Sequence, residues 1–338
     1  MARLDHGTHG DLNRAGPESF PAYRRTGLAV GLYAVAGAGW IGYEVEERGA
    51  DGGDFLTALY DPRAPFTPWA LTPHDWALLT AALVFGGIAF AGRRVARGAL
   101  MLLAAVLIGL ALRELVGLAV SSDYRAVLER SHYGQLLIGF RVTGLLVGVA
   151  TLIGMTRAGR RSVIPRSYVP YDAPPPPYGP PTAPRPAAAR PRLTAAGVCL
   201  LLSGAVAVAW LVYRLTRAQV YVVGGSPDAG VGGFFRDAVD ASYSTSIPYT
   251  FHTVAFALAP LAVGALLVAG RPAGRGAGLA LAFVLLYLDG RGLYAFVADD
   301  ALDLYFDSTL GTLAVLSTAC TTVLSLVTAA VLLGTEEA

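Results

Sequence analysis

Two stretches of this chain, HDWALLTAALVFGGIAFAGRRVARGA at residues 74–99 and HTVAFALAPLAVGALLVAGRPAGRGA at residues 252–277, align with each other without a gap. Eleven of the 26 aligned positions are identical. Ala and Gly matches are expected by chance in this composition. The less common matches are His74 with His252, Arg93 with Arg271, Arg97 with Arg275 and, further along in the same register, Arg113 with Arg291. We therefore predict an internal duplication.

The composition predicts a membrane protein. The chain of 338 residues is 54% hydrophobic and 15% charged, with a mean hydropathy of +0.51, whereas soluble domains are about 25% charged. Apolar runs of about 17–25 residues indicate transmembrane helices. We place eight of them near 27–43, 75–92, 98–120, 135–155, 194–213, 252–270, 277–298 and 309–333. The expected fold is all-α.

The duplication groups these eight helices into two units. We predict a first four-helix repeat at 27–155 and a second at 194–334, joined by a Pro/Arg-rich linker at 156–193 and flanked by tails at 1–26 and 335–338. Because four is an even number, both units cross the membrane in the same sense. The repeats are therefore expected to be parallel, related by an axis along the membrane normal.

The charges of the connecting segments predict the orientation. One alternating set of segments, which includes both termini, holds 16 Arg and 6 acidic residues, and the other set holds 7 Arg and 15 acidic residues. Arginine-rich segments remain in the cytoplasm. Since all 26 basic residues are Arg and the chain is rich in Gly, we expect a bacterial cytoplasmic-membrane protein with both termini cytoplasmic.

Five charged residues in predicted spans occupy one layer, at similar depths in the outer third of the membrane: Arg113, Glu114, Arg141, Asp289 and Arg291. A charge that faces lipid at the centre of a span costs about 2.5–3.5 kcal/mol on insertion scales. The five are therefore expected to turn inward, and Glu114 and Arg141 are a sensible cross-helix pair. Either this layer binds an anionic or polar ligand, or it consists of satisfied pairs that fix the packing of the repeats.

The segment LDGRG, at 288–292, raises a separate question about this layer. Asp289 and Arg291 are two residues apart, so they lie on opposite sides of a regular helix. Gly290 and Gly292 each weaken a helix by about 1 kcal/mol relative to Ala. A local break would let the two charges converge and would free backbone groups for a ligand, as in transporters with broken helices.

His74 and His252 form a second candidate site. They occupy equivalent positions in the two repeats, at the outer ends of their spans. A pseudo-twofold axis would bring them together as metal or haem ligands or as a proton sensor. The alternative is that each lies in contact with water at the membrane interface.

The segment DDALDLYFD contains Asp299, Asp300, Asp303 and Asp307. Over these nine residues it resembles the Mg-diphosphate motif of membrane prenyltransferases of the UbiA type. The resemblance implies a metal-dependent lipid enzyme. That family has a second Asp-rich motif on the cytoplasmic side, and RDAVD, with Asp237 and Asp240, is a poor counterpart. The alternative is an acidic, solvated outer loop.

The sequence is therefore compatible with three functions. The first is a carrier or receptor-like binder of a small anionic or polar ligand. The second is a non-catalytic scaffold or complex subunit that holds protein partners through its outer loops or its Pro/Arg linker. The third is the lipid enzyme. The net charge of +2 gives no nucleic-acid footprint, and the sequence predicts no cofactor and no metal site at Cys199 or Cys320.

Overall fold

The computed structural model describes residues 14–47, 52–61, 73–130, 132–161, 189–216, 249–298 and 301–334. Its helices are α1 (Phe20–Glu47), α2 (Gly52–Tyr60), α3 (Pro73–Phe90), α4 (Ala96–Val120), α5 (Ser122–Arg130), α6 (His132–Arg161), α7 (Ala189–Thr216), α9 (Tyr249–Val268), α10 (Pro272–Val297), α11 (Ala301–Phe306) and α12 (Thr309–Gly334). Apart from an isolated bridge between Arg14 and Arg93, the described residues form helices and short turns. The predicted all-α class is confirmed.

Seven helices, α3, α4, α6, α7, α9, α10 and α12, are long and apolar enough to cross a membrane. The protein is therefore a multi-pass membrane protein. The eighth predicted span, 27–43, lies in α1, which is long but is not among the seven. Five glycines dilute its apolar stretch. This span and the orientation of the chain stay predictions.

Three short helices that the apolar pattern did not predict, α2, α5 and α11, lie between the long ones. The long helices also exceed their predicted bounds: α6 continues to Arg161 and α7 begins at Ala189. Both ends of the predicted linker are therefore helical. Residues 162–188, which hold its proline-rich centre, lie outside the described part of the chain.

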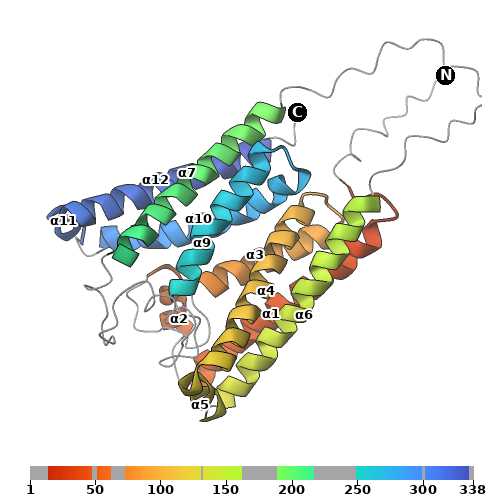
Figure 1. Cartoon of the computed structure of the whole chain (residues 1–338), viewed down its shortest axis with the longest axis horizontal. Helices are drawn as coiled ribbons and strands as arrows, with labels where there is room; N and C mark the ends of the chain where they lie inside the picture. The colour runs from red at the N-terminus through yellow and green to blue at the C-terminus, as the bar shows by residue number, and fades with distance from the viewer. Residues whose placement is uncertain are drawn as a thin grey trace, which may run out of the picture.

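The long helices form two groups (Figure 1). In the first group α1 packs against α3 and α6, and α4 packs against α6. In the second, α7 packs against α9 and α12, and α10 packs against α12. The groups meet mainly where α4 packs along α10, with a further contact between α3 and α10.

The turns that connect α3 to α4 and α9 to α10 have matching geometry. Gly92 and Gly270, which the sequence alignment of the two halves pairs, both have positive φ, at 74° and 66°. The residues that follow them, Arg93 and Arg271, each donate a backbone N–H to the carbonyl five residues earlier. This arrangement ends a helix with a glycine in the left-handed conformation, so each glycine allows a tight helical hairpin.

Equivalent positions also meet across the contact between the two groups. A Cβ atom at Gly98 would collide with the backbone carbonyl of Ala273, and one at Gly276 would collide with that of Val95. The alignment of the two halves pairs Gly98 with Gly276 and Val95 with Ala273. The contact is thus reciprocal, as it would be about a twofold axis.

Two further equivalent arginines hold the helix ends inside each group. Arg97 Nε donates to the Met155 carbonyl at 3.0 Å, and Arg275 Nε donates to the Leu332 carbonyl at 3.3 Å. These contacts join α4 to α6 and α10 to α12. A duplication would produce matches of this kind. The duplication itself and the bounds of its two units stay predictions.

Candidate functional site

Four buried charged side chains from three helices form one cluster in the first helical group. Arg113 and Glu114 lie on α4, Arg141 on α6, and Asp75 in the first turn of α3. Arg113 Nη1 lies 3.1 Å from Glu114 Oε1, Arg141 Nη1 lies 3.6 Å from Asp75 Oδ1, and Arg141 Nε lies 3.9 Å from Glu114 Oε1. All four are at most 6% exposed. With two positive and two negative charges, the cluster has no net charge.

Tyr124 completes the cluster from the short helix α5. Its hydroxyl donates to the Glu114 carboxylate, and its ring faces Arg113, whose guanidinium carbon is 5.3 Å from the ring centroid. The Ser121 hydroxyl accepts the Tyr124 backbone N–H at 3.0 Å, which caps α5 and fixes its start. Burial and the adjacent Glu114 carboxylate raise the pKa of Tyr124, so the phenol remains protonated and keeps donating.

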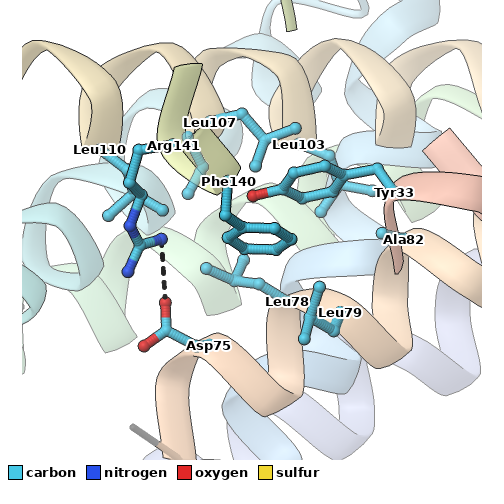
Figure 2. Close-up of a pocket in the computed structure, with 11 residues that line it drawn as sticks. Tyr33, Asp75, Leu78, Leu79, Ala82, Leu103, Leu107, Leu110, Phe140 and Arg141 are labelled. Atoms are coloured by element: carbon cyan, nitrogen blue, oxygen red, sulfur yellow. Dashed lines mark ion pairs between the residues drawn. The ribbon is translucent and has the colours of Figure 1, made fainter. Parts of the chain in front are cut away.

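A small cavity reaches this cluster at Asp75 and Arg141 (Figure 2). Its volume is about 20 Å³, counted as space open to the centre of a water molecule, which is enough for one or two waters. Tyr33 and Phe140 stack on each other in its wall, with ring centroids 4.5 Å apart. The other lining residues are apolar: Leu78, Leu79, Ala82, Leu103, Val106, Leu107 and Leu110.

Arg141 is incompletely paired at the polar end of this cavity. Two of its buried nitrogens, Nε and Nη2, have no hydrogen-bond partner among the described residues. The 3.9 Å separation from Glu114 is too long for a hydrogen bond. A buried donor without an acceptor costs about 1–3 kcal/mol, and more when the group is charged. The guanidinium can therefore donate hydrogen bonds to a further ligand with lone pairs, such as water, a carboxylate or a phosphate.

The structure brings the two candidate histidines together. The rings of His74 and His252 stack with centroids 4.5 Å apart and planes inclined by 8°. His74 lies within electrostatic range of Asp75 and Arg291. Ring-nitrogen lone pairs lie in the ring planes, so those of a parallel stack do not converge on one ion. This geometry does not suit ligation of one metal ion by both rings. His252 is 1% exposed, so it does not lie in contact with water as the alternative interpretation expects.

LDGRG does not break the helix. Helix α10 continues through Asp289 and Arg291 to Val297, and a Cβ at Gly290 would meet nothing within 4 Å. The two charges therefore face different partners, which corrects the expectation of a broken segment. Asp289 contacts Thr321 on α12, whereas Arg291 reaches α2. Neither lines the cavity beside Arg141.

Arg291 and two tyrosines of α10 hold the last turn of α2. Arg291 Nη2 donates to the carbonyls of Ala58 and Asp61, at 3.1 and 3.3 Å. The Tyr287 hydroxyl donates to the Leu59 carbonyl at 2.8 Å, and Tyr294 meets Tyr60 edge to face. Carbonyls at a helix C-terminus lack intrahelical partners and attract cations. The second helical group thus holds a helix that belongs to the first half of the chain.

We predict that Arg291→Gln loosens α2 selectively. A cation at a helix C-terminus contributes up to about 2 kcal/mol, so amide hydrogen exchange over 52–61 should accelerate about 5–30-fold. The matched control is Arg125→Gln, because Arg125 Nη1 donates to the Leu118 and Ala119 carbonyls near the end of α4 instead. Equal exchange in both variants would mean that Arg291 does not hold α2.

Of the four acidic residues in the motif, the structure describes Asp303 and Asp307. Helix α11 covers only Ala301–Phe306, so it ends before Asp307, and Asp303 and Asp307 are both exposed. Asp299 and Asp300 lie outside the described residues, as do Asp237 and Asp240. Within the described part of the chain, no three His, Cys, Asp or Glu side chains gather in a way that could hold a metal ion.

Sequence reasoning missed two members of the cluster, Asp75 and Tyr124. Asp75 stands at the first residue of a predicted span, where the aqueous boundary is expected, and Thr253 at the equivalent position gives no repeat signal. Tyr124 falls in a predicted outer loop. The signal that could have found Asp75 is charge balance, since the interiors of the predicted spans hold three arginines and only two acids.

Comparison of the chain with protein-family models, curated proteins and solved structures gave no match.

Proposed function

We propose that this integral membrane protein binds a small anionic or polar ligand beside Arg141, as a carrier or a receptor-like protein. The observation that supports this most strongly is the pair of buried Arg141 nitrogens without acceptors among the described residues, at the end of a cavity. Buried charges inside membrane proteins commonly mark ligand or ion paths. The site consists of Arg141 and Asp75, with Tyr33 nearby, and leaves out Asp289 and Arg291.

The walls of the cavity indicate what kind of molecule would enter. A carboxylate or phosphate oxygen would accept from Arg141 Nε and Nη2, and a donor on the same ligand would meet Asp75. The remaining lining is aliphatic or aromatic, which suits an apolar body behind a polar head. The present volume admits only a small group, so a longer ligand requires the helices around Phe140 to move apart.

The alternative is a scaffold, and one observation favours it. Arg113, Glu114 and Tyr124 satisfy one another by a salt bridge, a hydrogen bond and a cation–π contact. Because these three side chains are partners of one another, they fix the packing of their helices without a ligand. We assign this structural role to Arg113 and Glu114, and the binding role to Arg141 and Asp75.

Thermal unfolding in lipid nanodiscs tests the binding site, with phosphate, acetate and decanoate as probes. A ligand at 100 times its Kd stabilises by about 2.7 kcal/mol, so at least one probe should raise Tm. Arg141→Gln should abolish the increase. Ala82→Leu, which fills the cavity without changing any charge, should also abolish it and provides the test if Arg141→Gln unfolds. The control is Arg94→Gln, an exposed arginine. Equal stabilisation in all variants would contradict the assignment.

A further inference from the structure

Asp289 is a single carboxyl group inside the second helical group. It lies eight residues before Val297, the end of α10, and therefore about 12 Å along the helix from that end. Its Oδ2 atom is buried and has no hydrogen-bond partner among the described residues. The polar contact that it does make is with Thr321 on α12.

The contact with Thr321 indicates which group carries the hydrogen. Thr321 Oγ1 already donates to its own helix, with the Ser317 carbonyl at 3.1 Å and the Thr318 carbonyl at 3.0 Å. A hydroxyl has one hydrogen and two lone pairs, so toward Asp289 it offers a lone pair. With the hydroxyl hydrogen on these carbonyls, the contact is satisfied when the carboxyl group is protonated and donates.

No opposite charge among the described residues compensates an ionised Asp289. Helix α12 carries no Asp, Glu, Lys, Arg or His from Thr309 to Gly334, and Arg291 is engaged with α2. The other described titratable side chains on helices packed against α10 are Tyr60, His74, Asp75, Arg97, Arg113, Glu114, Arg190, Arg192, Cys199, Tyr213, His252, Asp303, Tyr305 and Cys320, with Asp61 directly after α2 and Arg275, Tyr287 and Tyr294 on α10 itself. Within the described residues, only Thr321 acts on Asp289 as a polar or charged partner.

A proton fits this environment better than a metal cation. Hard cations in proteins take several oxygen ligands. The polar partner of Asp289 among the described side chains is Thr321, and α10 and α12 are continuous helices whose carbonyls are used within the helix. An isolated carboxylate in a low-dielectric environment neutralises by protonation.

We propose that Asp289 is a proton-binding site within the membrane. In the packed state the carboxyl O–H donates to Thr321 Oγ1. When α10 and α12 separate enough to admit water, the O–H bond breaks, its electrons stay on the carboxylate, and the proton passes to water. This site is distinct from the cavity beside Arg141 and does not depend on it. In a carrier it would supply proton coupling.

Infrared difference spectroscopy of the full-length protein in nanodiscs tests the proposal, because a carboxylic acid and a carboxylate absorb at different frequencies. At neutral pH, Asp289→Asn should lose one carboxylic-acid band relative to the wild type. Asp303→Asn, which removes an exposed carboxyl group on α11, should leave that band in place. Thr321→Val, which keeps the side-chain shape and removes the acceptor, should shift the band and provides a second test if Asp289→Asn fails to fold.

Two results would overturn the proposal. Loss of carboxylate bands instead of an acid band in Asp289→Asn would mean that the group is ionised. Conversion of the acid band to carboxylate on adding NaCl at constant pH, with no effect of choline chloride, would identify a sodium site. Neither result bears on phosphate or decanoate binding beside Arg141, so the two proposals fail separately.

Discussion

Glu114→Gln is expected to destabilise the protein more than any other single charge change. Glu114 is a carboxylate that approaches two buried arginines, with Arg113 at 3.1 Å and Arg141 at 3.9 Å, and it also accepts from Tyr124. Removing one partner of a buried ion pair costs about 3–5 kcal/mol, because an uncompensated charge remains. The folded fraction, measured by size-exclusion chromatography after heating in detergent, should fall sharply.

The same substitution at Glu129 is the matched control. Glu129 lies on α5 with an exposed side chain, and exposed ion pairs contribute about 0–1 kcal/mol, so Glu129→Gln should behave like the wild type. The double variant Arg113→Gln/Glu114→Gln should lose less stability than the sum of the two single variants, since the charges are removed together. If Glu114→Gln lowered the folded fraction no more than Glu129→Gln does, water rather than Glu114 would compensate the buried arginine charges.

Gly98→Ala and Gly276→Ala should be about equally damaging. Each new methyl group would collide with a backbone carbonyl of the other helical group, that of Ala273 or that of Val95. Backbone cannot rotate away as a side chain can, so α4 and α10 must separate. Overpacking costs about 1–3 kcal/mol and occasionally more. Thermal unfolding of each variant measures the loss.

Controls for this pair come from glycines with open space around them. A Cβ at Gly31 or Gly290 would meet nothing within 4 Å, and Gly→Ala inside a helix favours the helix by about 0.5–1 kcal/mol. Gly31→Ala and Gly290→Ala should therefore be neutral or stabilising. A harmless Gly98→Ala would show that the two groups do not meet along α4 and α10, and a damaging Gly290→Ala would show that the losses do not report on that contact.

The sequence predicted the long helices better than it predicted their contacts. Continuous apolar runs signal spans directly, because lipid selects for them. The gapless alignment of the two halves also identified positions whose environments match, such as Gly92 and Gly270 or Arg97 and Arg275. The span at 27–43 is the weak case, since its glycines lower the apolar content of α1 while α1 packs closely against α3.

The candidate site was only partly predictable. Intramembrane charges stand out in the sequence, so Arg113, Glu114 and Arg141 were found. Their partners Asp75 and Tyr124 come from a helix start and a loop helix, where polar residues are common and carry no signal. The partners of Asp289 and Arg291 depend on which helices pack beside α10, which one chain does not reveal. Glycines in LDGRG suggested a break, but α10 is held on both sides and stays helical.

The most direct test of the central claim is an experimental density map of the protein in lipid, at a resolution that shows ordered water and small ligands. We predict non-protein density in the cavity between Asp75 and Arg141, within hydrogen-bonding distance of Arg141 Nε and Nη2. If the guanidinium instead turns to make two hydrogen bonds with Glu114 and side chains close the cavity, Arg141 is a structural residue and the binding proposal is wrong.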